Sequence, residues 1–319
     1  MSQYLARRVM QFVPVAFAVS VVIFVLLRVL PGDVARLLLM GPQGGGVAEP
    51  EQIERLRAEL GLNLPLYQQY LNWIQDFARL DLGKSYWSGE PITVIIARTF
   101  PVTLQLAVLT AVTAMIIALP VGIISAIRQD TWMDYAFRVV SVAGMTLPTF
   151  WTGTLVVLTL VLVFRWSPPI EFTNLWEDPA LSMEQFIWPV LVLGYWFAAP
   201  LSRMARSSML EVFRQEYIRT AWSKGLRERS VVFRHALKNA VLPVVTLAGV
   251  QTGRMLGGSV VVESIFGLPG MGRALVNGVI YHEYLLVQAI VLLIALIFMT
   301  STLSIDILYA WLDPRIRYR

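Results

Sequence analysis

Residues 100–127 read FPVTLQLAVLTAVTAMIIALPVGIISAI, an apolar stretch without a single charged side chain. A helix needs about 20 consecutive apolar residues to cross the hydrocarbon core of a bilayer, and this stretch is longer. Pro120 lies inside it, but transmembrane helices tolerate proline because neighbouring groups satisfy the freed backbone carbonyl. The stretch therefore predicts a transmembrane helix.

Further stretches of the same character lie at 9–27, 139–164, 185–203, 239–262 and 284–307. Of the 319 residues, 56% are hydrophobic and only 15% are charged. Soluble domains carry about a quarter charged residues, so this chain has too few charges to cover a surface in water. The sequence predicts an all-α integral membrane protein with six transmembrane helices. We interpret the first as an uncleaved helix, because it exceeds the apolar core of a signal peptide, about 7–15 residues.

The distribution of basic residues predicts the orientation of these helices. If the N-terminus is cytoplasmic, the cytoplasmic segments hold 16 Lys and Arg residues and the external segments hold eight. Cytoplasmic loops carry an excess of Lys and Arg, so both termini are predicted to be cytoplasmic.

The predicted helices divide the rest of the chain into segments outside the bilayer. Residues 1–30 hold a short tail and the first helix, and residues 31–99 form an external region. Within that region, helices are expected at 50–60, where Pro50 stands at the first turn and Gly61 follows the end, and at 66–80. A loop at 203–238 and a tail at 313–319 are cytoplasmic.

Composition excludes several chemistries. The chain has no cysteine, which excludes disulfides and thiol nucleophiles, and its only histidines are His235 and His282. We find no clustered catalytic constellation, so we predict no catalytic residue, no metal ligand and no cofactor bound by this chain. The net charge of +5 does not indicate nucleic acid, because the basic residues cluster in the loops between apolar segments.

The loop 203–238 combines nine basic and three acidic residues with apolar residues at regular intervals. This periodicity predicts amphipathic helices, and Gly225 interrupts it where a sharp turn or the close approach of another chain would be permitted. Two interpretations remain open on the residues alone. The loop lies on anionic membrane lipid, or it is a docking surface for a cytoplasmic partner.

Several separated motifs resemble the permeases of binding-protein-dependent ABC importers, in particular the first permease of dipeptide, oligopeptide and nickel systems. In order along the chain they are RVLPGD at 28–33, LDLGKS at 80–85, EYIRTAWSKGL at 216–226, RHALKNAVLP at 234–243, ESIFGLPGMG at 263–272 and LDPRIR at 312–317. The wider family has Glu-Ala-Ala-x-x-x-Gly in its cytoplasmic loop. Here Arg219 and Thr220 replace the first two residues, and only Ala221 and Gly225 keep the pattern.

The resemblance implies a type I ABC importer fold in a prokaryotic cytoplasmic membrane, with a permease domain at 94–312. It also implies four kinds of partner: a second homologous permease, two cytoplasmic ATPases that bind the ATP, an extracytoplasmic substrate-binding protein, and membrane lipid. The substrate is expected to be a di- or oligopeptide or a related solute, with nickel chelates, oligosaccharides and opines as alternatives. An ion-driven secondary transporter is disfavoured, because the predicted spans contain almost no carboxylates.

By the same resemblance, the loop 203–238 carries the helix that couples the permease to an ATPase. The coupling residues are then Arg219, Thr220, Ala221, Lys224, Gly225, Leu226, Arg227 and Glu228. Small residues at 221 and 225 would permit close approach, and the charges at 224, 227 and 228 would form ion pairs.

Arg254 and Glu263 are candidates for the translocation pathway, because Arg254 is a charge well inside a predicted span. Arg254 is expected either to face a cavity, where it would meet a substrate carboxylate or line the pathway, or to snorkel outward or pair with Glu263.

Overall fold

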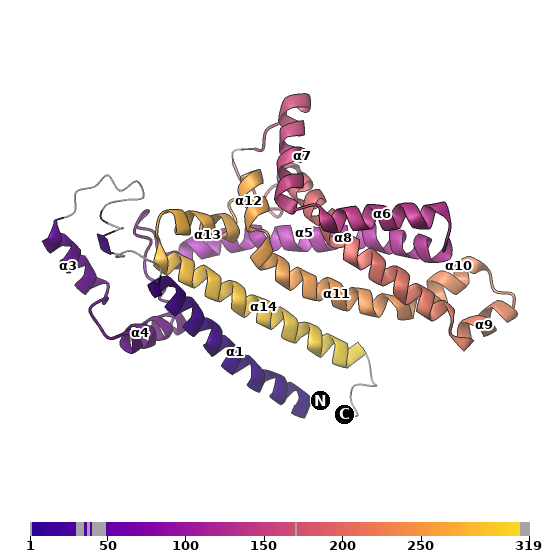
Figure 1. The fold of residues 1–319 in the computed structure, drawn as a ribbon, viewed down its shortest axis with the longest axis horizontal. Coiled ribbons are helices and arrows are strands. Elements are labelled where there is room, and N and C mark those ends of the chain that lie inside the picture. Colours follow the sequence, from indigo (N-terminus) through magenta and orange to yellow (C-terminus); the bar gives the residue numbers. More distant parts are fainter. Residues whose placement is uncertain (1, 30–34, 37–38, 40–48, 170, 313–319) are drawn as a thin grey trace.

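The computed structural model describes residues 2–29, 35, 36, 39, 49–169 and 171–312, and these residues are overwhelmingly helical (Figure 1). The tail 313–319 and the glycine-rich start of the external region lie outside the described residues. The main helices are α1 (Ser2–Val29), α3 (Pro50–Glu59), α4 (Leu66–Ala78), α5 (Ile92–Ile127), α6 (Trp132–Thr146), α7 (Thr149–Phe164), α8 (Pro179–Phe213), α9 (Glu216–Ser223), α10 (Glu228–Ser230), the π-helix η1 (Val231–Ala236), α11 (Leu237–Gly258), α12 (Val260–Phe266), α13 (Met271–Ile280) and α14 (Tyr284–Leu312).

Four helical segments are long and apolar enough to cross a bilayer: α5, α8, the continuous run Glu228–Met255, and α14. Helices α6 and α7 pass the same test only together, as a pair bent by 98°. The apolar part of α1, Met10–Leu26, is shorter. The prediction of an all-α membrane protein is confirmed, whereas the number of six spans stays a prediction.

The expected helix at 139–164 is interrupted, because α6 ends at Thr146 and α7 begins at Thr149. Leu147 between them is extended, with φ −76° and ψ 123°. A residue that precedes proline is pushed out of the helical region by the proline ring, and Pro148 follows here. Pro148 therefore interrupts the helix expected at 139–164, and the chain forms two shorter helices there.

The centre of the fold is the parallel pair α5 and α8, whose facing surfaces are closely packed. Five side chains in this interface are 0% exposed: Leu106, Ala114 and Ala118 of α5, and Phe186 and Leu201 of α8. Gly122 lets the backbones approach, since a Cβ built on it would lie 2.5 Å from Ala205 Cβ and 2.8 Å from the Ser202 carbonyl oxygen. Small residues at helix crossings are the usual means of packing helices within membranes.

The remaining long helices add to this pair in succession. α11 packs on α8, α14 on α11, and α1 on α14, so that α1 and α14 run side by side (Figure 1). Helices form at both positions expected in the external region, as α3 and α4, whereas their place outside the membrane stays a prediction. Tyr70 of α4 contacts α1, with its hydroxyl 2.8 Å from Ser20 Oγ and its ring edge-on to Phe24.

Replacing Gly122 by alanine is expected to destabilise the protein by about 1–3 kcal/mol, because the added methyl group overpacks the crossing of α5 and α8. The measurement is the apparent melting midpoint of the detergent-solubilised protein. The matched control is Gly153→Ala in α7, where the nearest atom to an added Cβ is Phe266 Cε2 at 3.5 Å. Equal midpoints for the two variants would contradict the close contact at Gly122.

Candidate functional site

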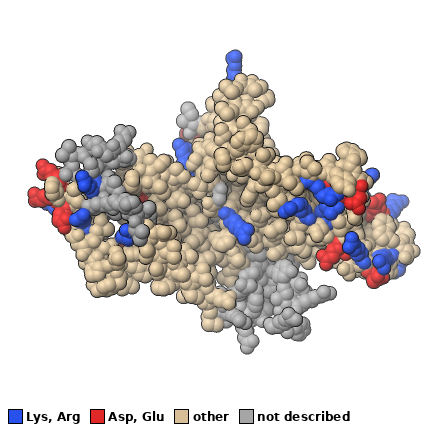
Figure 2. Space-filling view, viewed as in Figure 1, with Lys and Arg blue, Asp and Glu red and all other residues tan. Residues whose placement is uncertain are grey.

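The short helix α9 and the turn after it lie at one end of the molecule, opposite α3 and α4 (Figure 1). Charged side chains of both signs gather at that end, whereas the middle of the visible face is mostly uncharged (Figure 2). Glu216 opens α9, where a negative charge is favoured by the helix dipole. Gly225, with φ +72°, follows the end of α9, and its N–H donates to the Trp222 carbonyl oxygen at 2.9 Å. This left-handed glycine is a typical helix stop.

One face of α9 is built into the permease. Ile218 is fully buried and Ala221 is 7% exposed, in a cluster with Ile123 of α5, Met209 of α8 and Val231 of η1. On the same helix the Tyr217 hydroxyl accepts a hydrogen bond of 2.8 Å from Asn239 Nδ2 of α11. Four elements therefore hold α9, so a force on it is transmitted to the long helices.

The other face of α9 and the following turn are exposed. The exposed coupling candidates are Arg219, Thr220, Lys224, Gly225, Leu226, Arg227 and Glu228. The ion pair Arg219–Glu216, at 2.9 Å, is open to solvent and contributes little to stability. Lys224, Arg227 and Glu228 make no ion pair with any residue that the structure describes, so their charges are free for a partner.

The position of Ala221 in the structure does not match the role expected from the sequence. The sequence assigned its small side chain to close approach by a partner, but this side chain points into the buried cluster with Ile218. A methyl group suits that position because a larger one would push α9 away from α5 and α8. At position 225 the left-handed backbone favours glycine. No atom of the described chain lies within 4 Å of a Cβ built there, so packing within the permease does not require a small residue at this position.

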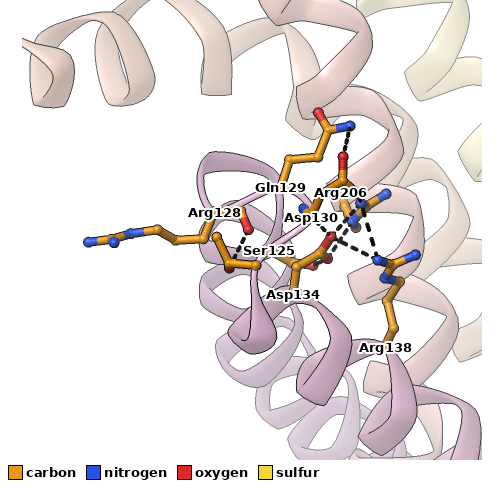
Figure 3. A network of polar contacts seen from close by, with 8 residues as sticks. Ser125, Arg128, Gln129, Asp130, Asp134, Arg138 and Arg206 are labelled. Carbon is orange, nitrogen blue, oxygen red and sulfur yellow. Dashed lines mark hydrogen bonds and ion pairs between the residues drawn. The ribbon is translucent and has the colours of Figure 1, made fainter.

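A buried ionic network near this end was not identified from the sequence. Asp134, in the first turn of α6, is fully buried and accepts two hydrogen bonds from Arg206 of α8, at 2.8 Å from Nε and 2.7 Å from Nη2 (Figure 3). Arg138 Nη2 and the Ser125 hydroxyl also donate to this carboxylate. The bidentate pair fixes the turn between α5 and α6 on α8, the helix that leads directly into α9.

The structure does not pair Arg254 with Glu263, the two residues proposed for the translocation pathway. Arg254 of α11 is exposed and lines a cavity of about 410 Å³, while Glu263 of α12 is not among the lining residues. The expected pairing alternative is not realised, since no ion pair joins the two within the described chain. Arg254 lies exposed at this cavity, and its place in the translocation pathway stays a prediction.

Glu263 is fully buried and hydrogen-bonded on both carboxylate oxygens. Oε1 accepts from Thr103 Oγ1 at 2.9 Å and from Ser259 Oγ at 2.8 Å, and Oε2 accepts from Arg273 N at 3.1 Å. This carboxylate thus accepts a backbone N–H from the first turn of α13. Met271 N, in the same turn, donates to Thr103 Oγ1 at 2.8 Å. In this structure Glu263 therefore anchors α13 against α5.

No group of three or more His, Cys, Asp or Glu side chains in the described part of the chain is placed to hold a metal ion. The arrangement is that of a helical membrane protein whose prominent polar features are a surface helix at one end and a charged cavity among the long helices.

Comparison with known proteins gives the family. Residues 118–318 match the family described as binding-protein-dependent transport system inner membrane component, and residues 1–107 match the N-terminal family of such components. The chain belongs to this family.

Similar proteins cover the whole chain. A protein of Brucella abortus (strain 2308) named as a peptide transport system permease protein is 36% identical over 318 residues, covering 100% of both chains. The glutathione transport system permease protein GsiC of Escherichia coli (strain K12) is 38% identical over 319 residues, again covering 100% of both. A crystal structure of an amino acid ABC transporter with histidines shares the fold, with a TM-score of 0.50 at 16% identity over 70% of this chain and 94% of that chain.

Family membership makes the chain a non-catalytic permease subunit in a membrane. It also implies, in general terms, ATPase and substrate-binding partners and a second permease. The resemblance seen in the motifs is thereby confirmed.

Replacing Asp134 by asparagine is expected to destabilise the protein by on the order of 2 kcal/mol, because it leaves the Arg206 guanidinium without its charged partner. The control is Asp130→Asn, four residues earlier, whose side chain is 66% exposed. The measurement is the melting midpoint in detergent. A midpoint lowered equally by both substitutions would contradict the importance of the buried pair.

Proposed function

We propose that this chain is the permease subunit of an ATP-driven importer for peptides or a related solute, in the cytoplasmic membrane of a prokaryote with both termini in the cytoplasm. The observation that carries the proposal is α9 together with the turn after it: one face of the helix is buried in the permease, and Lys224, Arg227 and Glu228 beyond its end carry charges that no described residue pairs. Relatives named for peptide and glutathione transport, at 36% and 38% identity, support the substrate class.

The orientation is supported by two features. α9 and α10 lie at the end opposite α3 and α4, and the N-terminus lies at the end of α1 away from α3 and α4 (Figure 1). The excess of basic residues in the segments on the α9 side agrees with a cytoplasmic position.

In the proposed mechanism, two ATPases bind ATP and close, and one of them pushes on α9. Because Ile218 and Ala221 join α9 to α5, α8 and η1, this push reorients the long helices between inward-facing and outward-facing states. A second permease completes the pathway, and an extracytoplasmic binding protein delivers the solute. The role of this chain is mechanical, and the ATP is bound by its partners.

Affinity purification of the tagged chain from detergent-solubilised native membranes is expected to recover a second permease and one or two ATPases. Mass spectrometry of the purified material identifies these chains. Recovery of the chain alone, still able to move solute in vesicles without ATP, would overturn the proposed energy source. Uptake of labelled di- and tripeptides, competed with nickel chelates, oligosaccharides and opines, then distinguishes the substrate classes.

Replacing Gly225 by tryptophan is expected to reduce solute uptake by about tenfold or more, because a bulky side chain on a left-handed backbone disturbs the turn next to the ATPase. The matched variant is Gly225→Asn, since asparagine tolerates this backbone conformation. Uptake and ATP hydrolysis are measured together in vesicles, and uptake is expected to fall more than hydrolysis. Unchanged uptake in Gly225→Trp at normal expression would contradict the role of this turn in coupling.

A further inference from the structure

The cavity beside Arg254, called here the Arg254 cavity, lies at the break between α6 and α7. Its walls include Thr149 and Phe150 at the start of α7, Trp196 and Phe197 of α8, and Gln251 and Arg254 of α11. The cavity is about 410 Å³ in volume, enough for part of a small solute. Three observations on its walls point to the same kind of ligand.

The first observation is an uncompensated positive charge. Arg254 lies within the predicted span 239–262, where an ionisable side chain is costly unless it meets a partner or a water-filled space. None of the residues lining the cavity is Asp or Glu, and Arg254 makes no ion pair or hydrogen bond with the residues that the structure describes. The expected partner of Arg254, the carboxylate of Glu263, is instead hydrogen-bonded to Thr103, Ser259 and the backbone of Arg273.

The second observation is the start of α7. This helix has 16 residues, and Pro148 before it has no side chain that could cap the free N–H groups. The first backbone bonds of α7 are from Trp151 N and Thr152 N to the Pro148 carbonyl oxygen, each at 3.1 Å. The N–H groups of Thr149 and Phe150 have no acceptor in the described chain. The positive end of the helix dipole thus adds to the charge of Arg254, as at the half-helices of transporters that bind anionic solutes.

The third observation is Gln251, which is independent of both charges. It lies three residues before Arg254 on the same face of α11 and is only 8% exposed. Its amide makes no hydrogen bond to any residue in the described ranges. Its amide is not one of the enclosed polar groups of the described chain that lack a partner, so it reaches the accessible space of the cavity, where a polar ligand would supply the partner that the protein does not.

We propose that the Arg254 cavity is a carboxylate-binding subsite of the translocation pathway. The guanidinium of Arg254, the amide of Gln251 and the free N–H groups of α7 hold the carboxylate, and Trp196 and Phe150 contact the apolar part of the solute. The proposal rests on the proposed function and narrows it to solutes that carry a carboxylate, such as peptides with a free C-terminus. Neutral oligosaccharides are excluded as substrates of this subsite.

The local potential of the cavity is measured without knowing the solute. The chain has no cysteine, so Thr149→Cys gives a single thiol at the cavity wall. In permeabilised membranes holding the assembled transporter, its reaction rates are compared for an anionic sulfonatoethyl methanethiosulfonate and a cationic trimethylammonioethyl methanethiosulfonate. Adding Arg254→Gln is expected to lower the anionic-to-cationic rate ratio about tenfold, because one nearby charge acts oppositely on the two reagents.

The matched control is Ser88→Cys in the external region, where Arg254→Gln is expected to leave the ratio unchanged. An unchanged ratio at Thr149→Cys would overturn the proposal. A thiol at Thr149→Cys that reacts with neither reagent would also overturn it, since a solute subsite has to be reached by water.

A second experiment measures the recognition itself. Cells lacking other peptide uptake systems are supplied with labelled trialanine and with its C-terminal amide. Arg254→Gln is expected to reduce the acid-to-amide ratio of uptake rates at least tenfold, whereas Arg254→Lys, which keeps the charge, retains most of the preference. A ratio that Arg254→Gln leaves unchanged would overturn the subsite. Failure of the parent transporter to take up any peptide would instead overturn the proposed peptide function, and the thiol measurement would still decide whether the cavity attracts anions.

Discussion

The packing of α5 against α8 is the interaction on which the rest of the structure depends. Gly122 brings the two backbones together at Ala205 and Ser202, and Ile123 of α5 and Met209 of α8 form part of the cluster that seats α9. Next to this crossing, the guanidinium of Arg206 of α8 donates a hydrogen bond to the carboxylate of Asp134 in the first turn of α6. In lipid there is no hydrophobic driving force between helices, so close backbone approach and satisfied polar pairs hold the crossing together.

Much of the fold was predictable, because the bilayer imposes strong constraints on sequence. Long uncharged stretches predicted the membrane helices, and Pro50 and Gly61 marked the bounds of α3. The break at Leu147 was missed because apolar length alone predicted one helix over 139–164, although Pro148 lies inside that stretch. The local rule that a residue before proline avoids the helical region would have indicated it.

Candidate functional residues could be identified from the sequence only where one position was unusual by itself. Arg254 stood out as a charge within a span, and Gly225 as an interruption of an amphipathic pattern. The pair Asp134–Arg206 could not be recognised, because its members are 72 residues apart and each has other neighbouring charges. The inward orientation of Ala221 likewise depends on where α9 sits against α5 and α8, which spacing alone does not specify.

The orientation of α9 bears on how transporters of this family change partners during evolution. Ala221 and Gly225, which keep the family pattern, serve the seating and the ending of the helix, whereas Arg219 and Thr220, which depart from it, lie on the outside. Under the proposed coupling, the side chains that would select one ATPase rather than another are those that can vary without disturbing the permease interior. A permease built in this way would be able to change its ATPase partner while the packing of its own helices stays the same.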